Sequence, residues 1–353
     1  MSSTWQKFRK SFSLFMTNGL VLAILLLPTS ASALDPIPAD SGFSGFLRLG
    51  AGVLNYSSNM VAGNGFLDIT DDTITSNTSG PDDETEFLPV INGELAYTFA
   101  STRTQITLGS QIEDIVRLET AQQLAVKQEL PDKSIISLGV LFSGMPTEVW
   151  KDPYLENSKR QETDRDSRGI KFAFDGILGS NFEFVYSYRD IDIDDEQSGN
   201  SQGLTAAERD LLRRDGDSHK ATLLYRFDLN NGHFIEPGFS YFDYDRDGNA
   251  MAHDGYEVQL TYFYLGDPLT VIATGMIGNA DFDAQNPIYN KTREDDLYLL
   301  GLQVYYKEPF GWKPFENASF SVYCGLSYYN EDSNINFYDA EMTMVDAGVL
   351  FRF

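Results

Sequence analysis

The chain is built largely from short segments in which apolar and polar residues alternate. In residues 342–353, Val345 and Val349 share one face, and Asp346 and Arg352 share the other. A period of two predicts strands whose two faces meet different surroundings. We expect about fourteen strands, with twelve to sixteen possible, and each covers about the ten residues that a tilted strand needs to cross a bilayer. Their centres lie near residues 48, 93, 108, 125, 139, 173, 186, 224, 238, 260, 274, 301, 323 and 347.

The connections between these strands differ systematically in length. Counted from the N-terminus, the even ones are short, such as Ser101-Thr102 and Asn230-Asn231-Gly232. The odd ones are mostly long and hydrophilic, such as residues 55–86 and 191–217. A soluble β-sandwich has no reason to sort its loops in this way. The pattern predicts an all-β fold, a transmembrane antiparallel up-and-down β-barrel with short turns at one end and long extracellular loops at the other.

The first residues read as a secretory signal peptide. Three basic residues among the first ten precede an apolar run from Leu20 to Leu27 and the small-residue site Ala31-Ser32-Ala33. A transmembrane anchor would need roughly twenty uninterrupted apolar residues, which this run does not reach. We therefore expect residues 1–33 to be cleaved and residues 34–353 to form the barrel domain.

The charge balance excludes one class of partner. Without the three basic residues of the leader, 23 of the 26 Lys and Arg residues remain against 52 Asp and Glu, a net charge of −29. So acidic a chain is not expected to bind nucleic acid. The single cysteine, Cys324, excludes an intramolecular disulfide, and the 13% of aromatic residues suits the girdles of a membrane barrel.

The carboxyl terminus resembles a known assembly signal. The last strand ends on an aromatic residue and has the polar, glycine and aromatic spacing by which the barrel assembly machinery recognises bacterial outer-membrane β-barrels. The residues that carry this resemblance are Asp346, Gly348, Phe351 and Phe353. The resemblance implies export through the periplasm to the outer membrane of a Gram-negative bacterium, with outer-membrane lipid and lipopolysaccharide as surroundings.

Within that class, the chain is similar to an uncharacterised family of Gram-negative proteins that carries only the label of a domain of unknown function. The likeness lies in the early segment from Ser41-Gly42-Phe43 to Asn59-Met60-Val61-Ala62-Gly63, in Val149-Trp150-Lys151-Asp152-Pro153-Tyr154 and in Arg213-Arg214-Asp215-Gly216. Such a family implies a fold and no chemistry, so function has to come from the lumen and the loops.

Charged residues of both signs are expected to line the barrel interior. By alternation the pore-lining residues are Arg48, Glu94, Lys127, Lys171, Asp175, Glu183, Arg189, Lys220, Arg226, Glu236, Glu257 and Arg352. The basic ones gather on the sixth to eighth strands and the acidic ones on the ninth and tenth, a crude segregation of sign that could set an ion preference. The alternative is that these charges pair with one another and fill the interior.

One part of the inner wall is apolar instead. Between the eleventh and the fourteenth strand, the inward residues are Ile272, Met276, Leu297, Leu299, Tyr305, Tyr323, Met342, Met344 and Leu350. Such a wall could be a track for an amphipathic solute. We rather expect a loop or the N-terminal segment to pack on it.

The third long loop should contain a short helix. Thr205 and Glu208 form a capping box that predicts a helix from about Ala206 to Arg214. Its basic residues are Arg209, Arg213 and Arg214. Folded into the mouth, this helix would make a constriction; on the extracellular rim it would only be a solvated cap.

A second loop has the spacing of a calcium site. Asp243, Asp245, Asp247 and Asp254 occupy the first, third, fifth and twelfth positions of such a loop. The last position is Asp where Glu is usual, and strands rather than helices flank the loop. Calcium is thus a possible ligand, with an acidic hairpin tip as the alternative, and no other cofactor is expected.

Catalysis has little support, since only His253 beside the loop aspartates loosely permits an outer-membrane protease site. His219, His233 and His253 are spread over a strand end, a turn and a loop, without the nucleophile and base that hydrolysis needs. The sequence favours a monomeric porin-like channel for small cationic or neutral solutes and not an enzyme. The alternative is a closed barrel whose acidic loops serve as a surface adhesion or cation-bridging platform.

Overall fold

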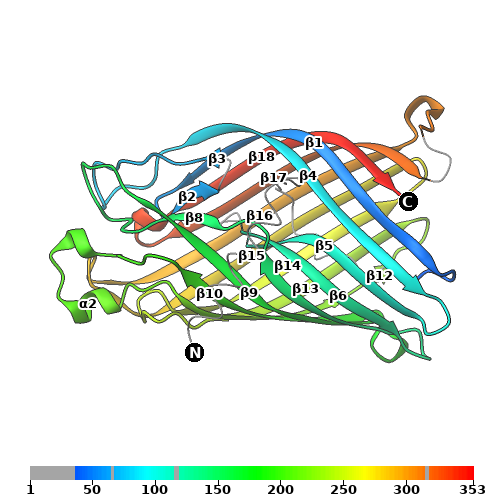
Figure 1. Ribbon diagram of the computed structural model, residues 1–353, viewed down its shortest axis with the longest axis horizontal. Coiled ribbons are helices and arrows are strands. Elements are labelled where there is room, and N and C mark those ends of the chain that lie inside the picture. The colour runs from blue at the N-terminus through cyan, green and yellow to red at the C-terminus, as the bar shows by residue number, and fades with distance from the viewer. Residues whose placement is uncertain (1–35, 65–66, 115–118, 315–317) are drawn as a thin grey trace, which may run out of the picture.

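A computed structural model describes residues 36–64, 67–114, 119–314 and 318–353, so the expected signal peptide lies outside the described residues. In this part of the chain, fourteen long strands form one antiparallel sheet in which every long strand pairs with its neighbours along the chain. The first and last strands, β1 and β18, pair from Phe46 with Arg352 to Ser58 with Ala340 and close the sheet into a barrel (Figure 1). The predicted fold and strand number are confirmed.

The long strands form the wall of the barrel. They are β1 (Gly42–Ser58), β4 (Glu84–Phe99), β5 (Thr104–Asp114), β6 (Glu119–Glu129), β7 (Ile135–Ser143), β9 (Glu162–Asp175), β10 (Phe182–Ile193), β11 (Gly216–Tyr225), β13 (His233–Tyr244), β14 (His253–Leu265), β15 (Leu269–Asn286), β16 (Lys291–Lys307), β17 (Ser319–Ser333) and β18 (Ala340–Arg352).

Short elements occupy the connections. They are the strands β2 (Val61–Asn64), β3 (Leu67–Asp68), β8 (Thr147–Trp150) and β12 (Phe227–Asp228), the 3-10 turns η1 (Ile177–Gly179), η2 (Asn200–Gln202), η3 (Pro309–Gly311) and η4 (Asn336–Tyr338), and the helix α2 (Ala206–Asp210). No helix in the described residues is long and apolar enough to cross a membrane.

The two ends of the barrel differ as the loop lengths predict. Long connections and α2 lie at one end, and the chain ends near the other, beside the short turns (Figure 1). By the usual orientation of such barrels, the long-loop end is extracellular and the short-turn end is periplasmic. At a periplasmic turn, Asn230, Asn231 and Gly232 all have positive φ, a conformation that asparagine and glycine tolerate best.

The alternation sorts side chains between lipid and lumen. On β16, Leu300 is 62% exposed on the outer face, whereas Leu299 is 4% exposed on the inner face. On β18, Val345 faces outward beside the buried Asp346. An exposed aliphatic band with a polar or packed inner face is the distribution a bilayer selects.

Aromatic side chains gather toward both ends of the outer face. At the periplasmic end, the rings of Phe43, Tyr97 and Phe99 contact edge to face, with centroids 4.9 Å apart in each contact. Nearer the extracellular end, the ring of Tyr241 lies 5.3 Å from that of Tyr256. Amphipathic rings at the two interfaces anchor a barrel at its depth in the membrane.

The closing seam is unusually tight. Gly50 of β1 pairs with Gly348 of β18. A Cβ atom at Gly50 would lie 2.3 Å from the Tyr323 hydroxyl, so only glycine leaves room for this ring on the inner wall. Arg48 covers the same ring, with its guanidinium carbon 3.8 Å from the ring centroid.

The first long connection enters the mouth of the barrel. Strand β4 pairs with β1 over residues 84–98, but with β5 only over residues 94–99. Higher up, β2 pairs with β8, which is itself paired with β9. Both β7 and β8 pair with β9. The other neighbour of β7 is β6, whereas the other neighbour of β8 is β2 from the first long connection.

Candidate functional site

The extracellular loops meet in a hydrophobic cluster of their own, which we call the cap. Its side chains come from six connections and include several that are almost inaccessible to solvent. The buried members are Tyr154, Leu212, Ala250, Met251, Ile335, Phe337 and Tyr338, and Met60, Ile74, Leu204, Leu211, Ile288 and Tyr289 pack against them. Loops that share one core hold each other in place across the barrel mouth.

Polar contacts fix the centre of the cap. The hydroxyls of Tyr154 and Tyr338 lie 2.6 Å apart, and the Asn286 amide donates to the Tyr338 hydroxyl at 2.6 Å. Arg293 covers the Tyr338 ring, with its guanidinium carbon 4.1 Å from the centroid. Arg293 also forms ion pairs with Asp295 and Glu331, so its buried charge is matched.

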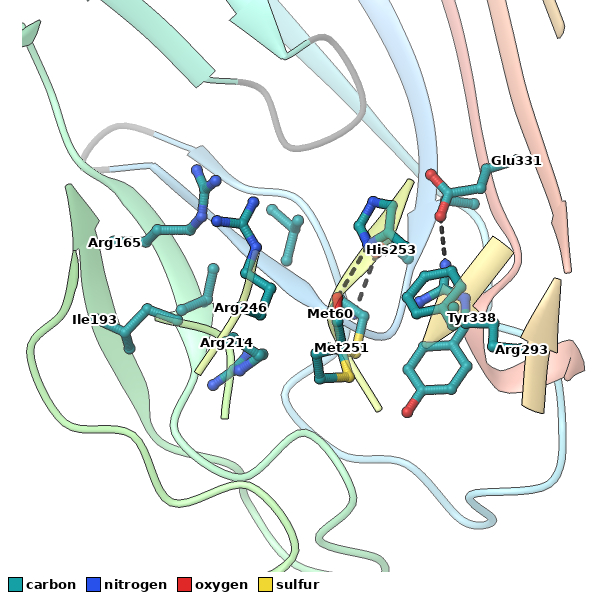
Figure 2. A pocket seen from close by; sticks show the side chains of 15 residues that line it. Met60, Arg165, Ile193, Arg214, Arg246, Met251, His253, Arg293, Glu331 and Tyr338 are labelled. Atoms are coloured by element: carbon teal, nitrogen blue, oxygen red, sulfur yellow. Dashed lines mark hydrogen bonds and ion pairs between the residues drawn. The ribbon is translucent and has the colours of Figure 1, made fainter. Parts of the chain in front are cut away.

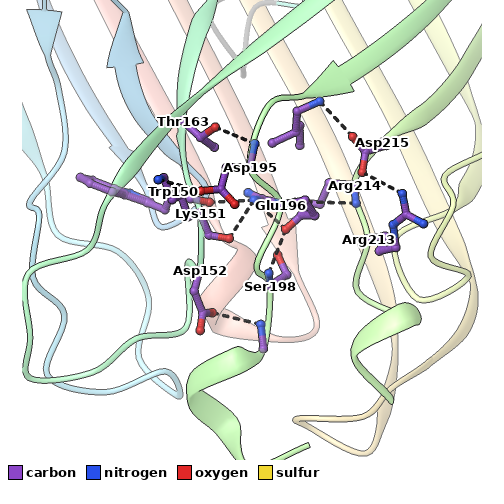
Figure 3. Close-up of polar contacts among 12 residues, drawn as sticks. Trp150, Lys151, Asp152, Thr163, Asp195, Glu196, Ser198, Arg213, Arg214 and Asp215 are labelled. Atoms are coloured by element: carbon purple, nitrogen blue, oxygen red, sulfur yellow. Dashed lines mark hydrogen bonds and ion pairs between the residues drawn. The ribbon is translucent and has the colours of Figure 1, made fainter. Parts of the chain in front are cut away.

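A buried ion pair lies within the connection between β10 and β11, and its arginine also bonds the connection between β7 and β9 (Figure 3). The Arg214 guanidinium donates from Nε to Glu196 at 2.7 Å and from Nη2 to the Trp150 carbonyl at 2.7 Å. Both charged side chains are 9% exposed. Burial acts to raise the pKa of Glu196, but the charge of Arg214 and the hydrogen bonds from Arg214 and Ser198 lower this pKa below its ordinary value of 4.5.

Asp152 ties the same loops together through main-chain groups. Its Oδ1 accepts hydrogen bonds from the Tyr154 and Gly199 amides at 3.2 and 3.0 Å. Its Oδ2 accepts one from the Ser201 amide at 2.8 Å. One carboxylate thus positions two loops that are about fifty residues apart in the sequence.

The apolar part of the inner wall is covered by the first loop. Val61 and Ile69 pack on inward side chains of five barrel strands, and all of these are buried. The wall residues are Leu54, Tyr56, Leu88, Val90, Leu299, Tyr329, Ala340, Met342 and Met344, with Met276 beside them. We predicted that a loop or the N-terminal segment would pack on the apolar wall. For four residues of that wall the first loop does so: Met276, Leu299, Met342 and Met344.

A cavity of about 70 Å³ lies beneath the cap. One part of its lining is basic, from Arg165, Arg214, Arg246 and Arg293. The remaining lining residues are Ser58, Met60, Val61, Val149, Ile193, Met251, His253, Phe282, Glu331, Tyr338 and Ala340. Figure 2 places Arg165 and Arg246 on one side, Arg293 and Glu331 on the other, and Met60, Met251 and His253 between them.

The predicted pore-lining charges lie on the inner face of the barrel, and several of them form ion pairs there. Lys220 bonds Glu257 at 2.6 Å and Arg226 bonds Glu236 at 2.7 Å. Both pairs join a basic residue of β11 or the position just after it to an acidic residue of β13 or β14, and the predicted segregation of sign stays a prediction.

Some of these charges stay hydrated, and others do not. The side chains of Lys220 and Arg226 keep 35% and 27% of their accessible surface, although they point into the barrel. Arg48 and Asp346, 2.6 Å apart on the closing seam, keep 3% and 6%. Glu183 and Arg189 are also buried, Glu94, Lys127, Lys171 and Asp175 are half-buried, and Arg352 is exposed at the periplasmic end.

The loop helix is shorter than predicted. Its capping box is present, but α2 ends at Asp210, because Leu211 and the buried Leu212 turn into the cap. The helix lies at the outermost extracellular tip (Figure 1). Of its predicted arginines, Arg209 bonds the Leu204 carbonyl and Arg213 is an exposed partner of Asp247, while Arg214 alone lines the cavity.

The calcium-type spacing does not gather ligands. Asp243 and Asp254 face each other on the paired strands β13 and β14, and Asp247 binds Arg213 instead. In the described part of the chain, no three His, Cys, Asp or Glu side chains are grouped so that they could hold a metal ion. The histidines bind other groups: His219 and His233 contact the hydroxyls of Tyr186 and Tyr262.

The residues of the predicted assembly signal all have places in the closed barrel. Asp346 pairs with Arg48, Gly348 faces Gly50, and Phe351 packs on the Phe320 ring. Phe353 exchanges main-chain hydrogen bonds with Gly45 and is half exposed. Recognition by the assembly machinery stays a prediction.

Sequence reasoning missed most of the cavity. Arg165 shares the inward alternation of Lys171, but it lies before the roughly ten residues of the strand that we expected around residue 173, whereas β9 begins at Glu162. Arg246 was passed over inside the acidic loop. The three stretches that carry the family likeness do meet here, since Met60, Val149 and Arg214 all line the cavity.

Comparison with known proteins gives a family. The model of the family described as "Protein of unknown function (DUF2860)" matches residues 42–352, and the chain belongs to this family. No match was found among curated proteins.

Solved structures share the barrel at low similarity. A FadL homologue of Pseudomonas aeruginosa has a TM-score of 0.43 and 11% identity, covering 93% of this chain and 94% of that one. The channel DcaP of Acinetobacter baumannii has 0.41 and 10%, covering 89% and 97%. OmpT, an outer membrane protein of Vibrio cholerae, has 0.40 and 10%, covering 88% and 98%.

Proposed function

We propose that the protein is an outer-membrane channel for the passive uptake of small solutes. One observation carries the proposal: Lys220 and Arg226 point into the barrel and remain 35% and 27% exposed. Inward charges that keep water contact indicate a hydrated lumen beside the wall formed by β11, β13 and β14. A hydrated lumen lined by both signs of charge suits a solute path.

The cap would control entry to this path. Its loops share an apolar core across the mouth, and the cavity beneath them is small. We infer that the loops set the size limit together, rather than one loop folded inward alone. A small solute would enter by transient opening between the loops or through gaps filled by water.

A second candidate has its own support. The same packed cap favours a closed barrel whose acidic loops act outside the cell as an adhesion or cation-bridging platform. The mature chain's expected charge of −29 suits divalent cations shared with lipopolysaccharide. This reading requires that the lumen does not conduct.

Conductance measured in planar bilayers distinguishes the channel from the closed platform. The purified mature chain, shown to be folded by its heat-dependent gel mobility, should give discrete conductance steps in potassium chloride. Deleting residues 204–215, which span α2 and a part of the cap, should raise the conductance if the cap limits entry. A folded sample without conductance steps, both in the parent and in the deletion, would support the platform.

The sign of the preferred solute is a separate matter. The overall charge predicts a preference for cations or neutral solutes in the outer vestibule. The cavity beneath the cap is basic, and selectivity is set where the path is narrowest. The two predictions oppose each other and can be measured separately.

A further inference from the structure

A buried carboxylate on the inner wall lacks a hydrogen-bond donor. Glu183 is the second residue of β10, close to a periplasmic turn, and only 4% of its surface is exposed. Its Oε2 atom is buried and accepts no hydrogen bond in the described part of the chain. Leaving a buried carboxylate oxygen without a donor costs stability, so such a group in a native fold calls for an explanation. A ligand that supplies the missing donor is one.

A second carboxylate lies directly opposite this one. In the pairing of β9 with β10, Asp175 faces Glu183. Side chains at such positions share one face of the sheet, with Cβ atoms about 5 Å apart, and like charges placed there are destabilising. A positive group between the two carboxylates would turn this repulsion into attraction.

Glu236 adds a third carboxylate from β13. It is 2% exposed, and its Oε2 bonds the Arg226 guanidinium at 2.7 Å, but its Oε1 is buried and accepts no hydrogen bond among the described residues. Asp175 and Glu236 repel the charge of Glu183. Lys171 and Arg226 attract it. With all five groups ionised, three carboxylates share two basic groups, and one negative charge is left over.

We call Asp175, Glu183 and Glu236 the carboxylate cluster. It lies where the barrel has its short turns, because Arg226 directly precedes β12 at that end (Figure 1). Asp175 is half-buried and the Arg226 side chain keeps 27% of its surface, so solutes in the lumen reach the edge of the cluster.

The surroundings of the cluster are partly apolar. Leu224, which faces Glu183 across β10 and β11, is 1% exposed. Phe263 is 6% exposed, and the guanidinium carbon of Arg226 lies 5.2 Å from the centroid of its ring. A cation that carries a short hydrocarbon stem would therefore meet acceptors and apolar side chains at the same place.

The arrangement of the acceptors narrows the kind of cation. Within the described residues, no three acidic, histidine or cysteine side chains are grouped so that they could hold a metal ion. A planar guanidinium suits the two oxygens of one carboxylate. The buried oxygens without donors belong instead to two different side chains, Glu183 and Glu236. An ammonium group, with three N–H donors that point in different directions, suits separate acceptors.

We propose that the carboxylate cluster binds a solute with a primary ammonium group and a short apolar stem. Its N–H groups donate to Glu183 Oε2 and Glu236 Oε1, beside the Asp175 carboxylate, and its stem lies against Leu224. This inference names the class of solute for the proposed channel, and it rests on that function for the path of the solute through the lumen.

Binding can be measured without any current. The purified barrel is unfolded by heat in a nonionic detergent at about pH 8, while propylammonium chloride replaces tetramethylammonium chloride at constant ionic strength. Propylammonium should raise the unfolding temperature with half-saturation on the order of 10 mM. Tetramethylammonium has the charge but no N–H donor, and added 1-propanol has the stem but no charge, so neither should have this effect. Because protons compete for the same oxygens, the effect should be weaker at about pH 5.

Two variants test the cluster itself. Glu183→Gln and Asp175→Asn should each weaken the propylammonium effect by about tenfold. Without ligand, Glu183→Gln should be at least as stable as the parent, because it removes a repelled charge and its Oε2 has no hydrogen bond to lose. Glu257→Gln is the matched control, since it removes the same charge from an inward carboxylate that is bound to Lys220. It should leave the propylammonium effect unchanged.

Three results would overturn the proposal. They are equal stabilisation by propylammonium and tetramethylammonium, an effect that survives both cluster variants, and a marked loss of stability in ligand-free Glu183→Gln. The last would mean that this carboxylate has a structural partner. Each variant is scored only after heat-dependent gel mobility shows it folded, and the second cluster variant decides the matter if the first does not fold.

Currents then separate the site from the channel. Propylammonium added on the periplasmic side should reduce the potassium current of the parent, because it occupies the path. Glu183→Gln should need about tenfold more propylammonium for the same reduction. A barrel that binds propylammonium but gives no conductance would remove the channel function and leave the site. A barrel that conducts but shows no stabilisation by propylammonium would overturn the site and leave the channel.

Discussion

Two interior ion pairs have the same separation and opposite surroundings. Arg48 and Asp346 lie 2.6 Å apart on the closing seam and keep 3% and 6% of their side-chain surface. Lys220 and Glu257 lie 2.6 Å apart between β11 and β14 and keep 35% and 16%. Both pairs follow from the same inward alternation. Packing, and not the strand pattern, decides which pair is dry.

The difference divides the lumen into two walls. The wall from β16 through β18 to β1 and β4 carries the first loop and a continuous apolar cluster. On the wall formed by β11, β13 and β14, the side chains of Lys220 and Arg226 keep 35% and 27% of their surface in contact with solvent. A barrel can in this way be half filled by its own loop and still keep a hydrated side.

The largest effect is expected on the dry wall. Asp346→Asn would leave Arg48 charged and buried beside Tyr323, without its carboxylate. Removing one partner of a buried pair costs about 3–5 kcal/mol. Guanidinium chloride titrations followed by heat-dependent gel mobility should show this loss, and Asp346→Asn combined with Arg48→Met should recover much of it. Parent-like stability of the single variant would mean that water reaches this pair as well.

The sequence determined the faces of the strands but not the contents of the lumen. Alternation at residues such as Leu299 and Leu300 fixes which side chain meets lipid, because the period of a strand is two. Met342 and Met344 could be recognised as inward and apolar, and a cover for them could be expected. Which loop covers them depends on Val61 and Ile69, and nothing local in the sequence of a loop states where its side chains will pack.

The residues of the cavity could not be predicted from the sequence for a related reason. Arg165 and Arg246 come from segments about eighty residues apart, and their meeting depends on how far β9 and β13 rise above the membrane. The spacing of the aspartates around Asp245 predicts a cation site. Arg246 lies between Asp245 and Asp247 in the sequence, and its side chain lines the cavity (Figure 2). Only the capping box and Arg214 gave a usable signal, and the helix they predicted was too long.

Acid should open the cap. The depressed pKa of Glu196 means that its ion pair with Arg214 stabilises the cap above the ordinary value of 4.5, and this contribution is lost as the pH falls through the depressed pKa. Proteolysis of the loops by an acid-stable protease, or conductance, should therefore increase below about pH 4.5.

Glu196→Gln should show the open behaviour already at pH 7, with about 1–3 kcal/mol less cap stability, because Arg214 keeps its bond to the Trp150 carbonyl. The pKa values of Asp195 and Asp72 are also lowered, by hydrogen bonds from Lys151 and Lys159, so these carboxylates too lose their charge only in acid. Comparing the variant with the parent isolates Glu196. Identical acid profiles in the two would assign the opening to the other carboxylates.

The smallest effect is expected on the wet wall, where it completes the comparison. Glu257→Gln removes the partner of Lys220 at the same 2.6 Å separation as in the dry pair, and water and mobile ions can replace the lost carboxylate. A pair in high dielectric contributes at most about 1 kcal/mol, so the guanidinium chloride midpoint should barely move. The charge of the lumen does change, and potassium should lose preference over chloride slightly in reversal potentials. A destabilisation as large as that of Asp346→Asn would mean that water does not reach this wall either. The exposed charges would then no longer support a hydrated channel.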